Sequence, residues 1–219
     1  MHPGKRAAAT AALDLVQPGT RLGIGSGSTV DVFIELLASR PGLVEAAVAA
    51  SSATEARLRE ARIDVLDLNM TGELELYVDG ADEIDPGLRM IKGGGAALTR
   101  EKVIAAASRK FACMVDSSKR VERLGAFGVP IEVVPMARSF VARRIVDMDA
   151  DPEYREGVRT DNGCVILDCH GFDIDDPEAL EARLNAIPGV LTNGIFAARR
   201  ADVLLVGADD GGVETVRAP

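Results

Sequence analysis

The architecture of this chain follows from the segment Leu74-Glu75-Leu76-Tyr77-Val78-Asp79-Gly80-Ala81-Asp82-Glu83. Leu74, Leu76 and Val78 alternate with Glu75 and Tyr77, which predicts a β-strand that ends at Asp79. The carboxylates of Asp79, Asp82 and Glu83 then stand where the chain leaves the sheet. In open α/β sheets, ligands bind at that carboxyl edge of the strands. We therefore expect an α/β protein with a site at the end of this strand.

A glycine loop follows in the segment Lys92-Gly93-Gly94-Gly95-Ala96-Ala97-Leu98-Thr99-Arg100-Glu101-Lys102. Glycines permit the crowded backbone angles at which successive N–H groups converge on an anion. Apolar residues then recur at helical spacing, which predicts a helix from Thr99 to Lys110 whose positive end faces the loop. Asp-Gly pairs and glycine runs also form turns and loops that have no function. Two such segments in one stretch, with Lys92 and Glu101, favour a site that moves protons on a small anionic substrate.

An earlier glycine-rich loop, Gly25-Ser26-Gly27-Ser28-Thr29, lies between a predicted strand at Arg21–Ile24 and a helix that starts near Val30. Its hydroxyls can cap the helix and bind oxyanions. The loop lacks the Gly-Lys-Ser/Thr ending of a P-loop. The next predicted strand, Val44–Ala50, ends in serines where a dinucleotide-binding fold has an acidic residue for the ribose. These features argue against a nucleotide cofactor and favour a cradle for a phosphate or for sugar hydroxyls.

Alternating strands and helices predict a mainly parallel, doubly wound (Rossmann-like) sheet with helices on both faces. From Gly125 the order of elements becomes β-α-β-β-α-β, which predicts an inserted ferredoxin-like α+β domain. We expect the α/β domain at residues 1–124 and 199–219 and the smaller domain at 125–198. The remaining predicted helices and strands are Ala7–Val16, Glu55–Glu60, Ile63–Leu66, Phe111–Val115, Ile131–Val134, Arg138–Val146, Tyr154–Val158, Val165–Cys169, a helix opened by Asp176-Pro177-Glu178, Val190–Phe196 and Val203–Val206.

Composition excludes several classes of function. The formal net charge of −9 argues against nucleic acid or an anionic membrane as a partner. No apolar run is long enough for a transmembrane helix and the N-terminus is unlike a signal peptide, so we expect a cytoplasmic protein. The three cysteines suggest reduced thiols, and no second cluster joins Cys169-His170 to complete a metal site. With two histidines in the chain, proton chemistry falls to carboxylates and lysines.

The ordered set of these segments resembles ribose-5-phosphate isomerase of the type A family, over essentially the whole chain. The resemblance is most specific in the loop at Ser26, in the segments around Asp79 and Lys92–Lys102, and in Asp116-Ser117-Ser118-Lys119. Pro135–Ser139 and Asp161-Asn162-Gly163 are also similar to family sequence. The family's first loop usually has threonine where Ser26 stands; the hydroxyl is kept, so we expect modest effects on affinity and the same reaction.

The resemblance implies reversible, cofactor-free and metal-free conversion of D-ribose 5-phosphate to D-ribulose 5-phosphate in the non-oxidative pentose phosphate pathway, by a homodimer or larger homo-oligomer. It implies that Glu101 is the base that carries a proton between C2 and C1 through an enediolate. Asp79 and Asp82 match positions that handle sugar hydroxyls and assist ring opening, and Lys92 matches the cation beside the oxyanion. The implied substrate-binding residues are Ser26, Gly27, Ser28, Thr29, Asp79, Gly80, Ala81, Asp82, Lys92, Gly93, Gly94, Gly95 and Lys119.

Two other interpretations remain open. A coenzyme A transferase or an amino-sugar-phosphate isomerase shares related architecture, although this chain is short for an added coenzyme A site. A non-catalytic sugar-phosphate sensor would keep Ser28, Thr29 and Lys119 but has no need of the acid and base groups. Binding without turnover distinguishes the sensor from the isomerase.

Overall fold

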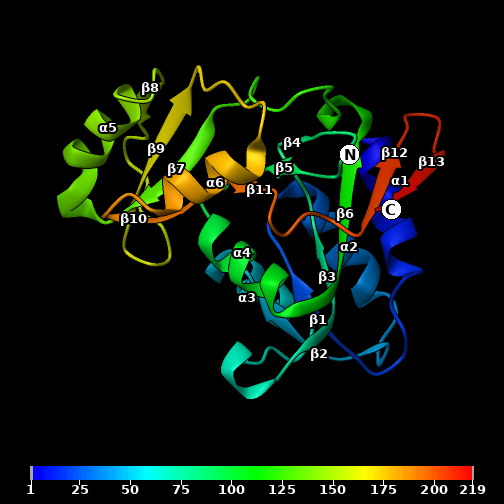
Figure 1. The fold of residues 1–219 in the computed structure, drawn as a ribbon. Coiled ribbons are helices and arrows are strands. Elements are labelled where there is room, and N and C mark those ends of the chain that lie inside the picture. Colours follow the sequence, from blue (N-terminus) through cyan, green and yellow to red (C-terminus); the bar gives the residue numbers. More distant parts are fainter. Residues whose placement is uncertain (1, 219) are drawn as a thin grey trace. The chain divides into compact units, whose positions relative to one another are not determined.

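The computed structural model describes residues 2–218, which form two compact units (Figure 1). The first unit comprises the chain up to Ala81, Arg100–Arg120 and the chain from Ala201 onward. The second unit comprises Asp82–Thr99 and Val121–Arg200. The domain ranges predicted above stay predictions. Their end residues, 1 and 219, lie outside the described part of the chain. The compact units differ from those ranges chiefly because residues 82–99 group with the second unit.

A six-stranded sheet forms the centre of the first unit, in the order β13-β12-β6-β3-β1-β2. The strands from β12 to β2 pair in parallel, whereas β13 runs antiparallel at the edge. The parallel pairing confirms the predicted mainly parallel sheet. The strands of this sheet are β1 (Thr20–Ile24), β2 (Val44–Ala49), β3 (Leu74–Asp79), β6 (Ser108–Asp116), β12 (Val203–Gly207) and β13 (Val213–Arg217).

Helices cover both faces of this sheet because its strands are apolar on both sides. On one face, Leu22 of β1 and Val78 of β3 belong to a core that also contains Ala8 and Phe33 of two helices. On the other face, Gly23 leaves space for the side chains of Ile104 and Tyr77. Figure 1 shows the first helix beside β12 and β6. The helices are α1 (Pro3–Leu13), α2 (Ser28–Ala38), α3 (Ser52–Glu60) and α4 (Leu98–Ala106), with 3₁₀ turns at Leu68–Met70 and Ser117–Lys119.

The second unit contains the predicted ferredoxin-like arrangement. Its four-stranded antiparallel sheet has the order β10-β7-β9-β8, and the chain order is β7-α5-β8-β9-α6-β10. A three-stranded sheet, β11-β5-β4, adds to it. The elements are β4 (Glu83–Ile84), β5 (Met90–Ile91), β7 (Val129–Val133), a 3₁₀ turn at Pro135–Ala137, α5 (Arg138–Val146), β8 (Asp151–Tyr154), β9 (Val165–His170), α6 (Pro177–Asn185), β10 (Val190–Asn193) and β11 (Ile195–Phe196).

Several predicted boundaries were wrong. Ile63–Leu66 makes one isolated bridge, between Ala47 and Val65, and is not a strand. The helix predicted to reach Lys110 ends at Ala106, because Ser108 and Lys110 pair with β3. The strand predicted at Val190–Phe196 is divided at Gly194, where the backbone lies too close to Lys92 and Pro130 for any side chain.

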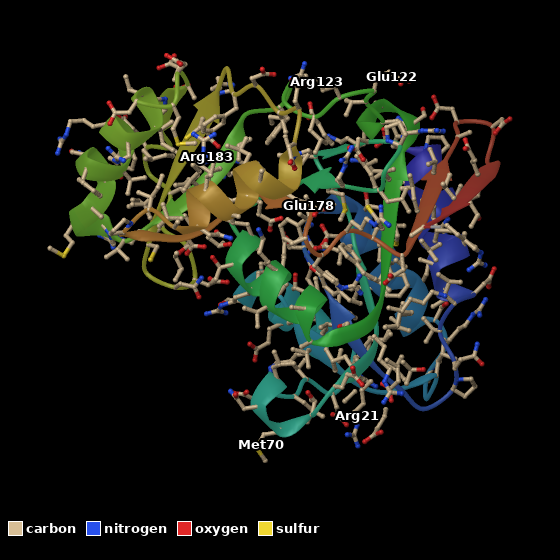
Figure 2. The ribbon with its side chains drawn as sticks, viewed as in Figure 1. Arg21, Met70, Glu122, Arg123, Glu178 and Arg183 are labelled. Carbon is tan, nitrogen blue, oxygen red and sulfur yellow. The ribbon has the colours of Figure 1, made fainter. Side chains whose placement is uncertain are left out.

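The amino ends of the strands in the first unit carry a separate group of exposed side chains. Arg21 pairs with Glu45 at 2.8 Å and donates to the Thr71 carbonyl at 3.3 Å. Figure 2 shows Arg21 and the exposed Met70 at this end. The predicted site residues Ser26, Asp79 and Lys119 lie instead at the carboxyl ends of β1, β3 and β6. Among residues 2–218, no helix combines the length and the apolar character that a membrane crossing requires.

Candidate active site

Asp79 ends β3 with its carboxylate against the loop that follows β1. The Asp79 side chain is fully buried, and its Oδ1 accepts hydrogen bonds from the backbone N–H groups of Ser26 at 3.1 Å and Gly80 at 2.7 Å. A Cβ atom at Gly25 would overlap the Asp79 carboxylate, so this close approach requires glycine. The first loop and the Asp-Gly turn are therefore two parts of one structure.

Tyr77 lies two residues before Asp79 on the same face of β3, and its hydroxyl donates to Asp79 Oδ2. Its ring is fully buried and lies 4.7 Å from that of Phe111. Burial raises the pKa of Tyr77 well above its usual range, and the negative charges of Asp79 and Glu101 raise it further. Tyr77 thus keeps its proton at neutral pH and stays a hydrogen-bond donor to Asp79. This role of Tyr77 was not predicted from the sequence, although the alternation in β3 places the two side chains together.

Glu101 lies in the first turn of α4 and is 3% exposed. Its Oε1 accepts a hydrogen bond of 2.6 Å from Ser26 Oγ. This distance is typical of a charge-assisted O–H···O⁻ bond. Ser26 therefore links two of the predicted catalytic carboxylates, since its N–H binds Asp79 and its hydroxyl binds Glu101. The methyl group that distinguishes threonine from Ser26 takes no part in either bond.

Gly27, Ser28 and Thr29 form the start of α2. Gly27 occupies the N-cap position with a φ of 95°, and Ser28 is the exposed first residue of the helix. Lys5 Nζ of α1 donates to Ser28 Oγ at 2.8 Å. A cation and a helix N-terminus thus lie together, as anion binding requires. Nothing local in the sequence indicates that Lys5 lies beside Ser28. Its helix is held against β12 by a close backbone approach of Gly4 and Gly207.

Lys119 follows the carboxyl end of β6, in a 3₁₀ turn that Asp116 caps through the Ser118 N–H at 3.0 Å. Burial opposes the ionisation of Asp116, but the hydrogen bonds from Ser118 and the charges of His2 and Lys5 lower its pKa. Because β6 is the parallel neighbour of β3, Lys119 and Asp79 both follow carboxyl ends of the same sheet. Gly80 and Ala81 continue the chain from Asp79.

The second unit holds the other predicted site residues, Asp82, Lys92 and the glycine loop. Asp82 Oδ2 accepts a hydrogen bond of 2.8 Å from the Gly94 N–H, which fixes the loop to Asp82. Lys92 is 3% exposed, and its Nζ lies 5.5 Å from the centroid of the Phe196 ring. That separation is typical of a cation–π contact. Gly93 has a φ of 108°, a conformation that favours glycine.

Possible metal ligands are scattered in the described part of the chain. Residues 2–218 contain no group of three or more His, Cys, Asp or Glu side chains placed to hold a metal ion. Cys113, Cys164 and Cys169 are buried free thiols, and burial raises the pKa of Cys164 and of Cys169. Cys169 and His170, considered above as ligands, end β9 in the second unit.

Comparison with known proteins agrees with this description. Residues 46–211 match the family model of ribose 5-phosphate isomerase A (phosphoriboisomerase A). Ribose 5-phosphate isomerase A from Neisseria gonorrhoeae is 44% identical, with a TM-score of 0.95 over 98% of this chain and 96% of that chain. The enzyme from Methanocaldococcus jannaschii is 36% identical, with a TM-score of 0.92 over 97% of each chain. A D-ribose-5-phosphate isomerase in complex with phospho-erythronic acid is 37% identical, with a TM-score of 0.93 over 97% of each chain.

The fold and these matches define an α/β enzyme of the aldose–ketose isomerase class. The chain belongs to the ribose 5-phosphate isomerase A family. The resemblance stated from the sequence is thereby confirmed.

Proposed function

We propose that this isomerase interconverts D-ribose 5-phosphate and D-ribulose 5-phosphate with Glu101 as the base, in the non-oxidative pentose phosphate pathway. The observation that carries the proposal is the 2.6 Å hydrogen bond from Ser26 Oγ to the buried Glu101 carboxylate. It gives a carboxylate a fixed direction at the start of a helix, in a chain that belongs to this family.

The reaction requires a base near the α-carbon and a positive charge near the carbonyl oxygen. Glu101 takes the proton from C2 of the open aldose, an enediolate forms, and the proton returns to C1 to give the ketose. Lys92 stabilises the negative charge that develops on the oxygen. A positioned base contributes about 10²–10⁴-fold to the rate and one oxyanion donor about 10²–10³-fold. Asp79 and Asp82 bind sugar hydroxyls and assist ring opening.

The remaining predicted residues bind the substrate in this proposal. Ser28 and Thr29 at the start of α2, with Lys119, hold the phosphate, and the glycine loop contacts the oxygens of the sugar chain. The hydrogen bond between Lys5 and Ser28 supports the phosphate assignment, because it brings a cation to the helix N-terminus. A relative at 37% identity is described in complex with phospho-erythronic acid, a ligand that is phosphorylated and acidic by its name. The contacts proposed for Ser26, Gly27, Gly80, Ala81, Gly93, Gly94 and Gly95 are to the same substrate.

The test is the rate of ribulose 5-phosphate formation without added metal or nucleotide. Glu101→Gln removes the base and keeps the shape, so we expect sugar-phosphate binding to persist and most turnover to be lost. Glu35→Gln, on the exposed side of α2, is the matched control and keeps full activity. Lys92→Ala lowers kcat through lost enediolate stabilisation; an effect confined to KM would assign Lys92 to substrate binding alone. An unchanged kcat in Glu101→Gln would refute the assignment of the base.

The alternative is a sugar-phosphate sensor that binds without turnover. It predicts that the wild-type protein binds ribose 5-phosphate but forms no ribulose 5-phosphate, with or without Glu101. The buried, hydrogen-bonded Glu101 argues for the enzyme, since a sensor has no use for a base fixed in this way.

We also propose that the chain forms a homodimer or a larger homo-oligomer. The second unit exposes apolar side chains beside its edge strand β10, with Met136 93%, Leu191 45% and Phe140 41% exposed. Such a group of exposed apolar side chains is typical of an interface. Sedimentation of the wild type and of a Met136→Lys/Phe140→Lys variant tests this face. A monomeric wild type would contradict the assembly, and an unchanged mass in the variant would contradict the face.

The proposed compartment is the cytoplasm. The support is the chemical state of the three buried cysteines, which are free thiols, as is usual in a reducing compartment. Fractionation of the source cells, with detection of the activity in the soluble cytosolic fraction, tests this location.

A further inference from the structure

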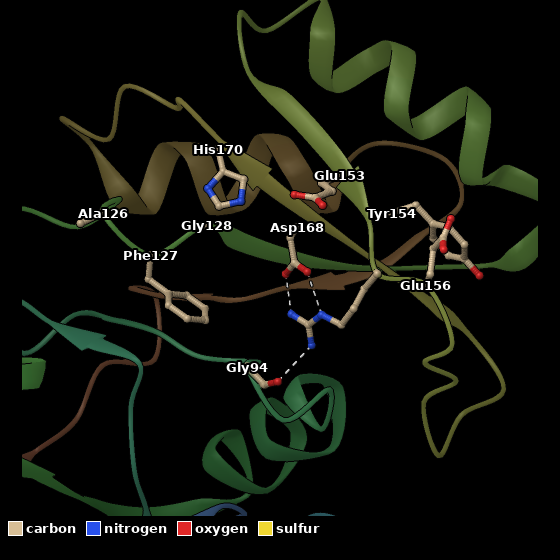
Figure 3. Close-up of a pocket in the computed structure, with 10 residues that line it drawn as sticks. Gly94, Ala126, Phe127, Gly128, Glu153, Tyr154, Glu156, Asp168 and His170 are labelled. Carbon is tan, nitrogen blue, oxygen red and sulfur yellow. Dashed lines mark hydrogen bonds and ion pairs between the residues drawn. The ribbon is translucent and has the colours of Figure 1, made fainter.

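Arg155, just after β8, contacts the glycine loop of the second unit although no feature of the sequence connects them. Its Nη1 donates to the carbonyl oxygens of Gly93 at 3.0 Å and Gly94 at 3.1 Å. Its other nitrogens bind Asp168 of β9 on both carboxylate oxygens, with Nε to Oδ2 at 2.7 Å. Figure 3 shows the dashed lines that end at Asp168 and at Gly94. One guanidinium therefore joins a strand of the ferredoxin-like sheet to a loop proposed to bind substrate.

The direction of these bonds determines where the loop's N–H groups point. The peptide bonds of the described chain are trans, so each C=O lies opposite the N–H of its own peptide unit. When the Gly93 carbonyl faces Arg155, the Gly94 N–H must face away, and it donates to Asp82 Oδ2 at 2.8 Å. When the Gly94 carbonyl faces Arg155, the Gly95 N–H likewise faces away. Arg155 thus aligns two successive N–H groups on the side of the loop that carries Asp82.

We propose that Arg155, oriented by Asp168, is a positioning residue for the isomerisation. It fixes the glycine loop so that the Gly94 N–H holds the Asp82 carboxylate and the Gly95 N–H is directed toward the sugar chain, where it donates to the oxygen that becomes negative in the enediolate. This inference rests on the proposed role of Gly93–Gly95 in binding the substrate. Arginine suits the task because its planar fork serves a carboxylate and a backbone carbonyl at once, which the single ammonium of lysine does not.

The pair is also accessible from solvent, which makes the proposal testable by chemical rescue. A pocket of about 880 Å³ in the second unit is lined by Arg155, Asp168 and Gly94, together with Phe127, Glu153 and His170. Figure 3 shows Phe127 and His170 around Asp168. The Arg155 side chain is 18% exposed and that of Asp168 22%. A free guanidinium ion can therefore reach the space left by a truncated Arg155 and bind Asp168 and the loop carbonyls in its place.

The experiment measures kcat and KM for ribose 5-phosphate in Arg155→Ala, with and without millimolar guanidinium chloride below denaturing concentrations. Since a misplacement of about 1 Å can lower a rate by about 10²-fold, we expect kcat to fall by about 10- to 100-fold and guanidinium to restore at least part of it. Arg159→Ala is the matched control, because Arg159 donates Nη1 to a different glycine carbonyl, that of Gly163, at 2.8 Å. It keeps wild-type kcat and shows no response to guanidinium. Asp168→Asn, which keeps Arg155 but removes its orienting charge, gives a smaller fall in kcat.

The outcomes separate this inference from the proposed function. Loss of kcat in Arg155→Ala with recovery by guanidinium, at an unchanged thermal midpoint, supports the positioning role. An Arg155→Ala kcat within about twofold of wild type, or a loss of kcat that guanidinium does not reverse, overturns it. If Arg155→Ala does not fold, a wild-type kcat in Asp168→Asn overturns it equally. A wild type that forms no ribulose 5-phosphate would instead refute the proposed function itself.

Discussion

The substitution Tyr77→Phe tests the buried link between the sheet and Asp79. Phenylalanine keeps the ring against Phe111 and removes one oxygen, so no large cavity forms. The loss is the hydrogen bond to Asp79 Oδ2, inside a fully buried pair. Asp79 Oδ1 retains its bonds to the N–H groups of Ser26 and Gly80.

The expected cost follows from that one bond. A hydrogen bond to a charged group contributes about 1.5–3 kcal/mol, so the free energy of unfolding at pH 7 falls by about this amount. For a chain of this length, each kcal/mol of lost unfolding free energy lowers the midpoint of thermal unfolding by about 2–4 °C. We therefore expect the thermal midpoint of Tyr77→Phe to lie about 3–12 °C below that of the wild type. Urea unfolding measures the free energy directly, and its m-value remains unchanged because the fold is kept.

The same residue predicts a difference at alkaline pH. Burial, then the charges of Asp79 and Glu101, raise the pKa of Tyr77 in the folded protein well above its usual value of about 10. Below about pH 10 the phenol is protonated in both states, and its contribution to stability is fully present. Above that pH the unfolded chain loses the proton first, so wild-type stability falls by up to about 1.4 kcal/mol per pH unit. Tyr77→Phe has no phenol at this position. Above pH 10 its free energy of unfolding therefore falls less steeply with pH than that of the wild type, by up to about 1.4 kcal/mol per pH unit.

The assay is direct because the chain has two tyrosines and no tryptophan. Tyr154→Phe, at a half-buried position beside Arg138, leaves Tyr77 as the single phenol and serves as the control for stability. In that variant we expect phenolate absorbance to appear only as the protein unfolds. Reversible phenolate absorbance near pH 10 with unchanged circular dichroism, or wild-type stability of Tyr77→Phe at pH 7, would refute the reasoning.

Four further predictions concern the site and its support. Ser26→Ala removes the donor to Glu101 and lowers kcat about tenfold or more, whereas Ser26→Thr keeps the hydroxyl and stays within about threefold in the same assay. In Gly25→Ala the new methyl group overlaps the Asp79 carboxylate, so kcat falls by about 10²-fold, and normal kinetics would show that the loop can move aside. Glu132→Leu removes the buried acceptor of the Thr99 and Thr160 hydroxyls, so the free energy of unfolding measured in urea falls by about 1–3 kcal/mol or more. The control Glu122→Leu replaces an exposed carboxylate and changes that free energy by about 0.5 kcal/mol. EDTA leaves kcat unchanged, and inactivation that added metal reverses would require a metal in the mechanism.

The periodicity of the sequence predicted the main sheet and the ferredoxin-like unit because apolar residues determine both. Strands buried on two faces form short apolar runs such as Phe111–Val115, and amphipathic helices show their own spacing. Errors arose where tertiary pairing decides the outcome. Ile63–Leu66 is apolar enough for a strand but gains one bridge, and β4, β5 and β11 have two residues each, too few for any period.

The candidate site was predicted where residues lie at the carboxyl ends of neighbouring parallel strands. Because β1, β3 and β6 are adjacent, Ser26, Asp79 and Lys119 follow the same edge of the sheet whatever the loop lengths. Supporting residues escaped prediction because their contacts span long separations in the chain. Lys5 meets Ser28 across 23 residues and Arg155 meets Gly93 across 62, and nothing local in the sequence indicates either contact.

The acidic composition of the chain does not conflict with an anionic substrate. At physiological ionic strength the Debye length is about 8 Å, so most of the surface charge behind the net −9 is screened from any one site. A single cation at about 4 Å, in an environment of effective dielectric constant near 20, is worth about 4 kcal/mol. Lys5 of α1, which contacts Ser28 at the start of α2, and the buried Lys92 are placed to supply such local charges, each in its own unit. The net charge therefore governs solubility and the rate of encounter, whereas under the proposed function affinity for the phosphate and the enediolate depends on these few cations and on the glycine loop that Asp82 and Arg155 hold in place.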